Sequence, residues 1–173
     1  MILGMTTPTF TLVHVLLSLV GIACGLIVVF GMTKGKQLDG LTAIFLATTV
    51  LTSVTGFFFP NDHITPGIVI GILSMILLTL AILARYAFHL SGAWSRTYAV
   101  TATTSLYLNV FILVVQCFEK VPALHALAPT QKELPFKITQ LVVLVLFVGL
   151  TIAAAKGFSR HVAVHEDRER RAA

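Results

Sequence analysis

Five long apolar runs divide the chain and are separated by polar links. The runs cover residues 10–32, 41–59, 67–90, 98–118 and 136–158. Each is close to the ~20 residues that a helix needs to cross the roughly 30 Å hydrocarbon core of a bilayer. Hydrocarbon leaves backbone amides without water, and the runs lack the strict alternation of barrel strands. The pattern therefore predicts five transmembrane helices.

The links between the runs predict how these helices pack. The segments 33–40, 61–66 and 91–97 are short, so consecutive helices should be antiparallel neighbours in a compact all-α bundle. We expect a five-helix transmembrane domain over residues 1–158 and a basic cytoplasmic tail over residues 159–173. The first run is longer than a signal-peptide core and no Lys or Arg precedes it, so we expect it to be retained.

Composition supports this class of protein. Hydrophobic residues make up 57% of the 173 residues and charged residues only 11%, which leaves too little polar surface for a soluble domain. The chain is therefore expected to have the lipid bilayer as its main partner.

The distribution of the 12 Lys and Arg residues predicts the orientation. With five spans, nine of them fall on one side of the membrane and three on the other. Cytoplasmic loops collect Lys and Arg, so we expect the N-terminus outside and the C-terminus in the cytoplasm. The basic tail should then face anionic lipid headgroups and not nucleic acid. The cytoplasmic group comprises Lys34, Lys36, Arg85, Arg96, Lys156, Arg160, Arg168, Arg170 and Arg171, and the outer group comprises Lys120, Lys132 and Lys137.

The long fourth link predicts the location of a site. Residues 116–136 hold three prolines, a histidine and balanced charges, and the loop 119–135 should lie as a cap over the outer mouth of the bundle. Polar side chains in hydrocarbon are costly enough to turn toward one another, toward water or toward a ligand. We therefore predict a ligand-binding pocket beneath the cap. Its expected walls are His14, Asn109, Gln116 and Gln140.

Most other polar residues in the spans have a simpler explanation. The Ser and Thr residues of the second and fourth runs are expected to bond to carbonyls of their own helices. For His14 alone, a structural bond to a neighbouring helix competes with a ligand role. Arg85 and Lys156 lie near the cytoplasmic ends of their runs and are expected to snorkel, which weakens a proton- or sodium-coupled pump.

Two GxxxG motifs predict close helix crossings. Gly21 with Gly25, and Gly67 with Gly71, remove side-chain bulk at one-turn spacing and let backbones approach. A five-helix bundle has many crossings of its own, so we favour internal packing over a dimer contact for these glycines.

The chemistry of the site stays open between three classes of protein. We favour a non-enzymatic, self-associating membrane protein with a binding pocket or path for a small, weakly polar solute near the outer leaflet. An alternative is a redox module that binds haem or quinone through His14 with His63 or His125. A third is an accessory subunit of a larger membrane complex. The sequence has no CxxC or HExxH motif and no nucleophile and base at recognisable spacing, so it names no metal, cofactor or hydrolytic reaction.

Several short segments resemble a set of small bacterial inner-membrane proteins of uncharacterised activity. They are FFFP at 57–60, LNVF at 108–111, KVP at 120–122 and LAPTQ at 127–131. The resemblance spans most of the chain and implies a multi-pass protein of the bacterial inner membrane. It carries no activity with it.

The predicted orientation can be tested with reporter fusions. A periplasmic reporter inserted within 126–132 should be active, because the cation bias places this loop outside. The same reporter fused after Ala173 should be inactive. Reversed activities would contradict the orientation and would move the predicted pocket to the cytoplasmic side.

Overall fold

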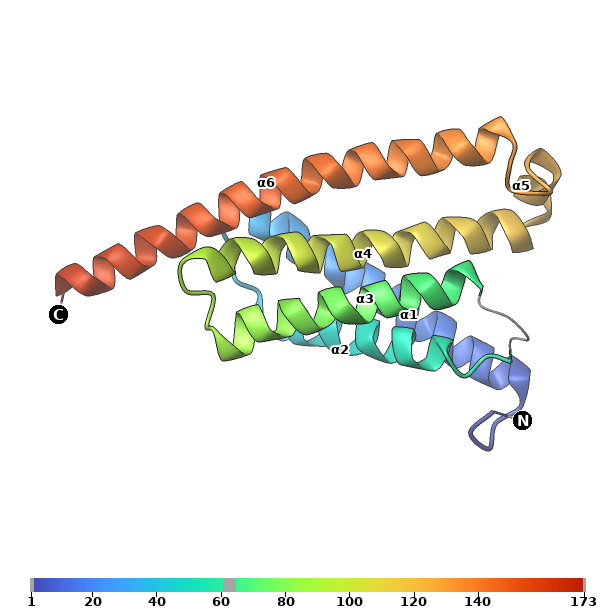
Figure 1. Ribbon diagram of the computed structural model, residues 1–173, viewed down its shortest axis with the longest axis horizontal. Helices are drawn as coiled ribbons and strands as arrows, with labels where there is room; N and C mark the ends of the chain where they lie inside the picture. The colour runs from blue at the N-terminus through green and yellow to red at the C-terminus, as the bar shows by residue number, and fades with distance from the viewer. Residues whose placement is uncertain (1, 61–64, 173) are drawn as a thin grey trace.

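The protein is a bundle of long helices with its two termini at opposite ends (Figure 1). The structure is a computed structural model that describes residues 2–60 and 65–172, with side chains described as far as Val162. Within this part of the chain, five helices are long and apolar enough to cross a membrane. The predicted all-α bundle is confirmed. Its elements are α1 (Thr7–Thr33), α2 (Asp39–Gly56), α3 (Pro66–Ile82), the π-helical turn η1 (Leu83–Ala87), α4 (Ala93–Lys120), α5 (Pro122–Leu127) and α6 (Leu134–Ala172).

Helix ends follow from local backbone chemistry. The hydroxyls of Thr6 and Thr65 accept hydrogen bonds from amides in the first turns of α1 and α3, and each of these helices has a proline in its first turn. The second helix ends at Gly56, earlier than the predicted 59, because Phe59 precedes Pro60 and is disfavoured in helical conformation.

The third span also ends earlier than predicted. It leaves the α-helix in the wider turn η1 and stops at Ala87 instead of 90, since His89 and Leu90 have positive φ angles of 49° and 59°. The last helix ends later than predicted, because it continues through the predicted tail as far as Ala172. The boundary predicted at residue 158 is therefore not a break in the helix.

The fourth span is the central element of the bundle. Helix α4 contacts every other helix. Each of the helices α1, α2, α3 and α6 contacts α4 and, besides it, only the outer helices that lie next to it. It is also the most buried of the five spans. Its buried polar side chains, Thr101, Thr103 and Ser105, bond to carbonyls one turn back in the same helix, as expected from the sequence. A span with many small polar residues thus occupies the position with the least lipid contact.

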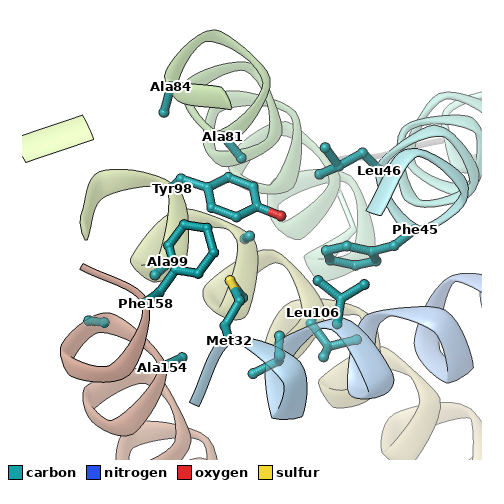
Figure 2. Packing of buried hydrophobic residues seen from close by; sticks show 14 of the residues in the cluster. Met32, Phe45, Leu46, Ala81, Ala84, Tyr98, Ala99, Leu106, Ala154 and Phe158 are labelled. Carbon is teal, nitrogen blue, oxygen red and sulfur yellow. The ribbon is translucent and has the colours of Figure 1, made fainter. Parts of the chain in front are cut away.

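The apolar core lies where α4 meets α1, α2, α3 and α6 (Figure 2). Tyr98 and Phe158 pack ring against ring with centroids 5.5 Å apart. Phe45 and Leu106 are completely buried between α2 and α4. These contacts join all five spans into one hydrophobic cluster.

Glycines set the closest crossings inside the bundle. A Cβ atom on Gly25 would lie 2.7 Å from Leu106 and 2.8 Å from Phe45, and one on Gly21 would lie 3.1 Å from two threonine hydroxyls of α2. Gly21 and Gly25 therefore pack inside the bundle and cannot form a contact with a second copy of the chain. Of the second motif, Gly71 faces the ring of Phe57, whereas Gly67 is exposed.

The tightest approach joins the end of α1 to α6. A Cβ atom on Gly157 would lie 2.3 Å from the carbonyl oxygen of Thr33, which is a backbone atom that cannot rotate away. Only a glycine lets the two helices cross at this distance.

Substitution of Gly157 by alanine should therefore separate α1 from α6. We expect Gly157→Ala to lower the free energy of unfolding by about 1–3 kcal/mol, the usual range for overpacking. Thermal unfolding in detergent measures this change. The matched control is Gly149→Ala in the same helix, where a Cβ atom meets nothing within 4 Å. The control should be neutral or stabilising, and an equal loss in both variants would contradict the crossing.

Candidate functional site

His14 is held in the interface between α1 and α2. Its Nδ1 atom lies 2.8 Å from the hydroxyl oxygen of Thr55. That hydroxyl directs its own hydrogen to the Leu51 carbonyl at 2.7 Å, so it accepts from Nδ1–H. We assign the tautomer on this geometry, which leaves the lone pair on Nε2. The ring also packs edge-on against Phe59, with centroids 5.2 Å apart.

One turn deeper, α1 is tied to the central helix. The Ser18 hydroxyl donates to Oδ1 of Asn109 at 3.1 Å. Asn109 is only 9% exposed, and its Nδ2 atom has no hydrogen-bond partner. Gly21 lies beside this amide, since a Cβ atom there would be in ordinary van der Waals contact with Nδ2 at 3.6 Å.

Threonines of α2 complete the same interface. Thr48 and Thr49 face Gly21 but donate to carbonyls of their own helix. Thr52 lies between them and Thr55 at helical spacing, so it shares the face that meets α1. It is 8% exposed and its hydroxyl has no partner.

We call this group of side chains the α1–α2–α4 seam. It comprises His14, Ser18, Gly21, Thr48, Thr49, Thr52, Thr55 and Asn109. Donors and acceptors from three helices meet in it, and two buried polar atoms stay unpaired. Buried polar groups in native proteins are almost always hydrogen-bonded, so such exceptions call for an explanation.

An apolar layer closes the seam on the side toward the C-terminal end of α1. Gly25, Phe45 and Leu106 meet there in direct contact. Beyond this layer lies a second polar group, in which Arg85 pairs with Asp39. The two polar regions of the bundle are thus separated by packed hydrocarbon side chains.

Arg85 corrects one prediction from the sequence. It was expected to snorkel toward the membrane surface, but its side chain is only 7% exposed and turns into the bundle. Its guanidinium lies 5.3 Å from the ring centre of Tyr98, which is close enough for a cation–π contact. The Tyr98 hydroxyl lies near Thr42 and Arg85 but outside hydrogen-bond geometry. The Tyr98 ring stabilises the buried guanidinium from inside the bundle, and its counter-ion, Asp39, has a side chain that is 79% exposed at the surface.

Only two of the four predicted pocket residues, His14 and Asn109, lie in the same interface. His14 faces α2 and Asn109 faces α1, whereas Gln140 of α6 donates to the Phe111 carbonyl of α4 at 3.2 Å. Gln116 is exposed on α4. Among the described residues, none of the four is hydrogen-bonded to another of the four. The seam joins two of them in one interface, through Ser18, which the sequence did not single out, and through threonines of α2 that were expected only to bond within their helix.

The fourth link packs on the ends of α4 and α6. Ala128 is completely buried, Phe118 and Phe136 meet edge to face with centroids 5.4 Å apart, and Gln131 donates to the Val115 carbonyl at 3.3 Å. Helix α5 contacts α4 and lies away from the start of α1 in Figure 1. The link therefore covers the α4–α6 end of the bundle.

The structure describes two of the three histidines of the redox hypothesis, His14 and His125. His125 is exposed on α5, whereas His14 points toward α2. His63 lies outside the described residues. In the described part of the chain, no three His, Cys, Asp or Glu side chains gather as a metal site would require.

Comparisons with known proteins add no family to this picture. No protein-family model, curated protein or solved structure matches the chain. By helix length and hydropathy it is a multi-pass membrane protein.

Sequence reasoning missed the partners of the polar residues. Thr48, Thr52 and Thr55 recur every three to four residues and mark one face of α2, which is a signal for a helix contact. The pairing of Asp39 with Arg85 had a weaker signal, namely opposite charges expected at the same membrane level.

The start of α6 offers a pH-dependent test of the fourth link. The Glu133 carboxylate accepts from the Thr130 hydroxyl at 2.8 Å and from the Lys132 amide at 3.0 Å. These hydrogen bonds, with that of Thr130 first, hold the pKa of Glu133 below its ordinary value. The folded link thus gains stability above the unfolded-state pKa of glutamate and loses it as pH falls through the folded pKa.

We expect Thr130→Val to raise the pKa of Glu133 toward its ordinary value. A carbon-detected NMR titration of the carboxyl group in detergent measures it. Thr139→Val is the control, since that hydroxyl bonds to the Pro135 carbonyl within α6. A Glu133 pKa that is the same in both variants and wild type would contradict the capping contact.

Proposed function

We propose that the protein is a non-enzymatic membrane protein that binds a small, weakly polar solute in the α1–α2–α4 seam. The observation that carries the proposal is the pair of unpartnered buried atoms, Asn109 Nδ2 and Thr52 Oγ1. An unsatisfied polar group inside a protein costs about 1–3 kcal/mol, and hydrocarbon supplies no partner for it. A bound molecule that accepts from Asn109 would remove this cost.

The chemistry of the seam indicates the class of solute. Asn109 offers an N–H donor, Thr52 a hydroxyl that both donates and accepts, and His14 an acceptor at Nε2 in the tautomer assigned above. The seam contains no charged side chain. A small neutral molecule with a carbonyl or hydroxyl group fits these partners, whereas an ion would have no counter-charge.

The apolar layer favours binding over continuous passage. Phe45 and Leu106 are completely buried and contact the Gly25 position directly. A solute that entered the seam from the N-terminal end would stop at this layer. Passage to the Arg85 side would require these side chains to move.

The cation distribution supports the membrane and the orientation that we assign to this activity. Nine of 12 Lys and Arg residues fall on the side of the C-terminus, as in proteins of the cytoplasmic membrane. With this orientation the seam lies in the outer half of the bundle. The short segments described above favour the bacterial inner membrane as its location.

Replacement of Asn109 tests the binding site. Protein purified with native lipid is extracted with solvent, and the small molecules that it retains are identified and quantified by mass spectrometry. Asn109→Leu keeps the size of the side chain but removes the donor, so we expect about three- to tenfold less retained solute, the effect of one hydrogen bond.

The control for this test is Ser105→Ala. Ser105 lies one turn from Asn109 on the same helix face, but its hydroxyl is satisfied by the Thr101 carbonyl. This variant should retain solute as wild type does. Equal retention by wild type and Asn109→Leu, or a loss that accompanies unfolding in both variants, would contradict binding in the seam.

A further inference from the structure

A basic cleft lies at the opposite end of α1 from His14. It has a volume of about 250 Å³ and is formed between the end of α1 and the last membrane turn of α6. Its walls are Lys34, Gly35, Gly157, Arg160 and His161. None of these residues belongs to the seam.

The turn after α1 gives the cleft one wall. The Gly35 amide donates to the Met32 carbonyl and the Lys36 amide to the Gly31 carbonyl, both at about 3 Å, which is the Schellman arrangement. Gly35 adopts a φ of +70°, which this turn requires at that position. The last carbonyls of α1 are thus partly neutralised by amides, and the Lys34 side chain is presented at the surface.

Glycine also brings the second wall close. The Gly157 crossing places α6 against the Thr33 carbonyl, and a Cβ atom on Gly35 would lie 2.7 Å from the Cβ atom of His161. Lys34 of one helix end and Arg160 of the other therefore line the same hollow.

Two cationic side chains, Lys34 and Arg160, line the cleft. Lys34 and Arg160 are exposed, and among the side chains described neither forms an ion pair. The nearest carboxylate described, Asp39, is engaged by Arg85. Along α6 the next acidic residue is Glu166, five positions after His161. An anion in the cleft would lie between these two cationic side chains.

The depth of the cleft indicates the source of the anion. Lys34 follows the last residue of α1, and Arg160 lies two residues after the last apolar run, which ends at residue 158. This is the level where hydrocarbon gives way to lipid headgroups. On the same face of α1, Phe30 and Ile27 lie one and two turns before Lys34 and are 56% and 52% exposed. An acyl chain would lie on these residues with its headgroup at the cleft.

We propose that the cleft binds the phosphate group of an anionic phospholipid. Arg160 supplies a planar donor group suited to phosphate oxygens, and Lys34 supplies a second cation from the facing wall. Because the apolar face of α1 beside the cleft is exposed and could hold an acyl chain, we expect the ligand to be a lipid and not a free anion. The proposal is independent of the solute bound in the seam.

The test uses native mass spectrometry of the full chain in neutral detergent with phosphatidylglycerol. The variant Lys34→Gln/Arg160→Gln should bind this lipid roughly thirtyfold more weakly than wild type, because each cation near the headgroups contributes comparably to its attraction. Phosphatidylcholine should bind wild type and variant equally. Thermal unfolding without added lipid checks that the variant is folded, since both substituted side chains are exposed.

Two further measurements test the proposal. Lys120→Gln/Lys137→Gln removes the same charge from exposed positions at the other end of the bundle and should bind phosphatidylglycerol as wild type does. Equal losses in the two double variants would overturn the site, as would no loss in either. Inorganic phosphate at equal concentration should not displace the lipid, and displacement would overturn the lipid assignment in favour of a free-phosphate site.

Discussion

Hydrocarbon supplies no hydrogen-bond partner, and this constraint determines which helix lies at the centre of the bundle. Helix α4 carries Thr101, Thr103, Ser105 and Asn109, and all four are buried. The three hydroxyls are satisfied within the helix, but the Asn109 amide has more hydrogen-bonding atoms than its own backbone can satisfy. Surrounding α4 with the other helices keeps these groups away from lipid and gives Asn109 a partner on α1.

Glycines on α1 and α6 allow this arrangement to close. Gly21 and Gly25 let α1 approach α2 and α4, and the approach brings Ser18 within bonding distance of Asn109. At the other end, Gly157 lets α6 cross the Thr33 carbonyl. The same small residues that pack the bundle therefore shape both the seam and the basic cleft. Packing and candidate function depend on the same backbone contacts.

The bundle is layered along its axis from polar to apolar to polar. The seam lies toward the N-terminal end, the Phe45 and Leu106 layer follows, and the pair of Arg85 and Asp39 lies beyond it. A neutral solute matches the uncharged seam, whereas the buried guanidinium is already matched by a carboxylate and an aromatic ring. This layering is why we assign binding to the seam and anion recognition to the exposed cleft.

The sequence by itself determined the class of protein and the five long apolar helices, because the length and hydropathy of a span are local properties. It also predicted that Ser and Thr would bond within their helices. Only the tertiary structure decided that His14 meets Thr55, that Gln140 meets α4 and that Arg85 turns inward. All five spans are apolar around most of their circumference, so hydrophobic pattern does not select the face that meets a neighbour. That choice depends on close backbone contacts between residues far apart in the chain, and these exist only once the bundle has formed.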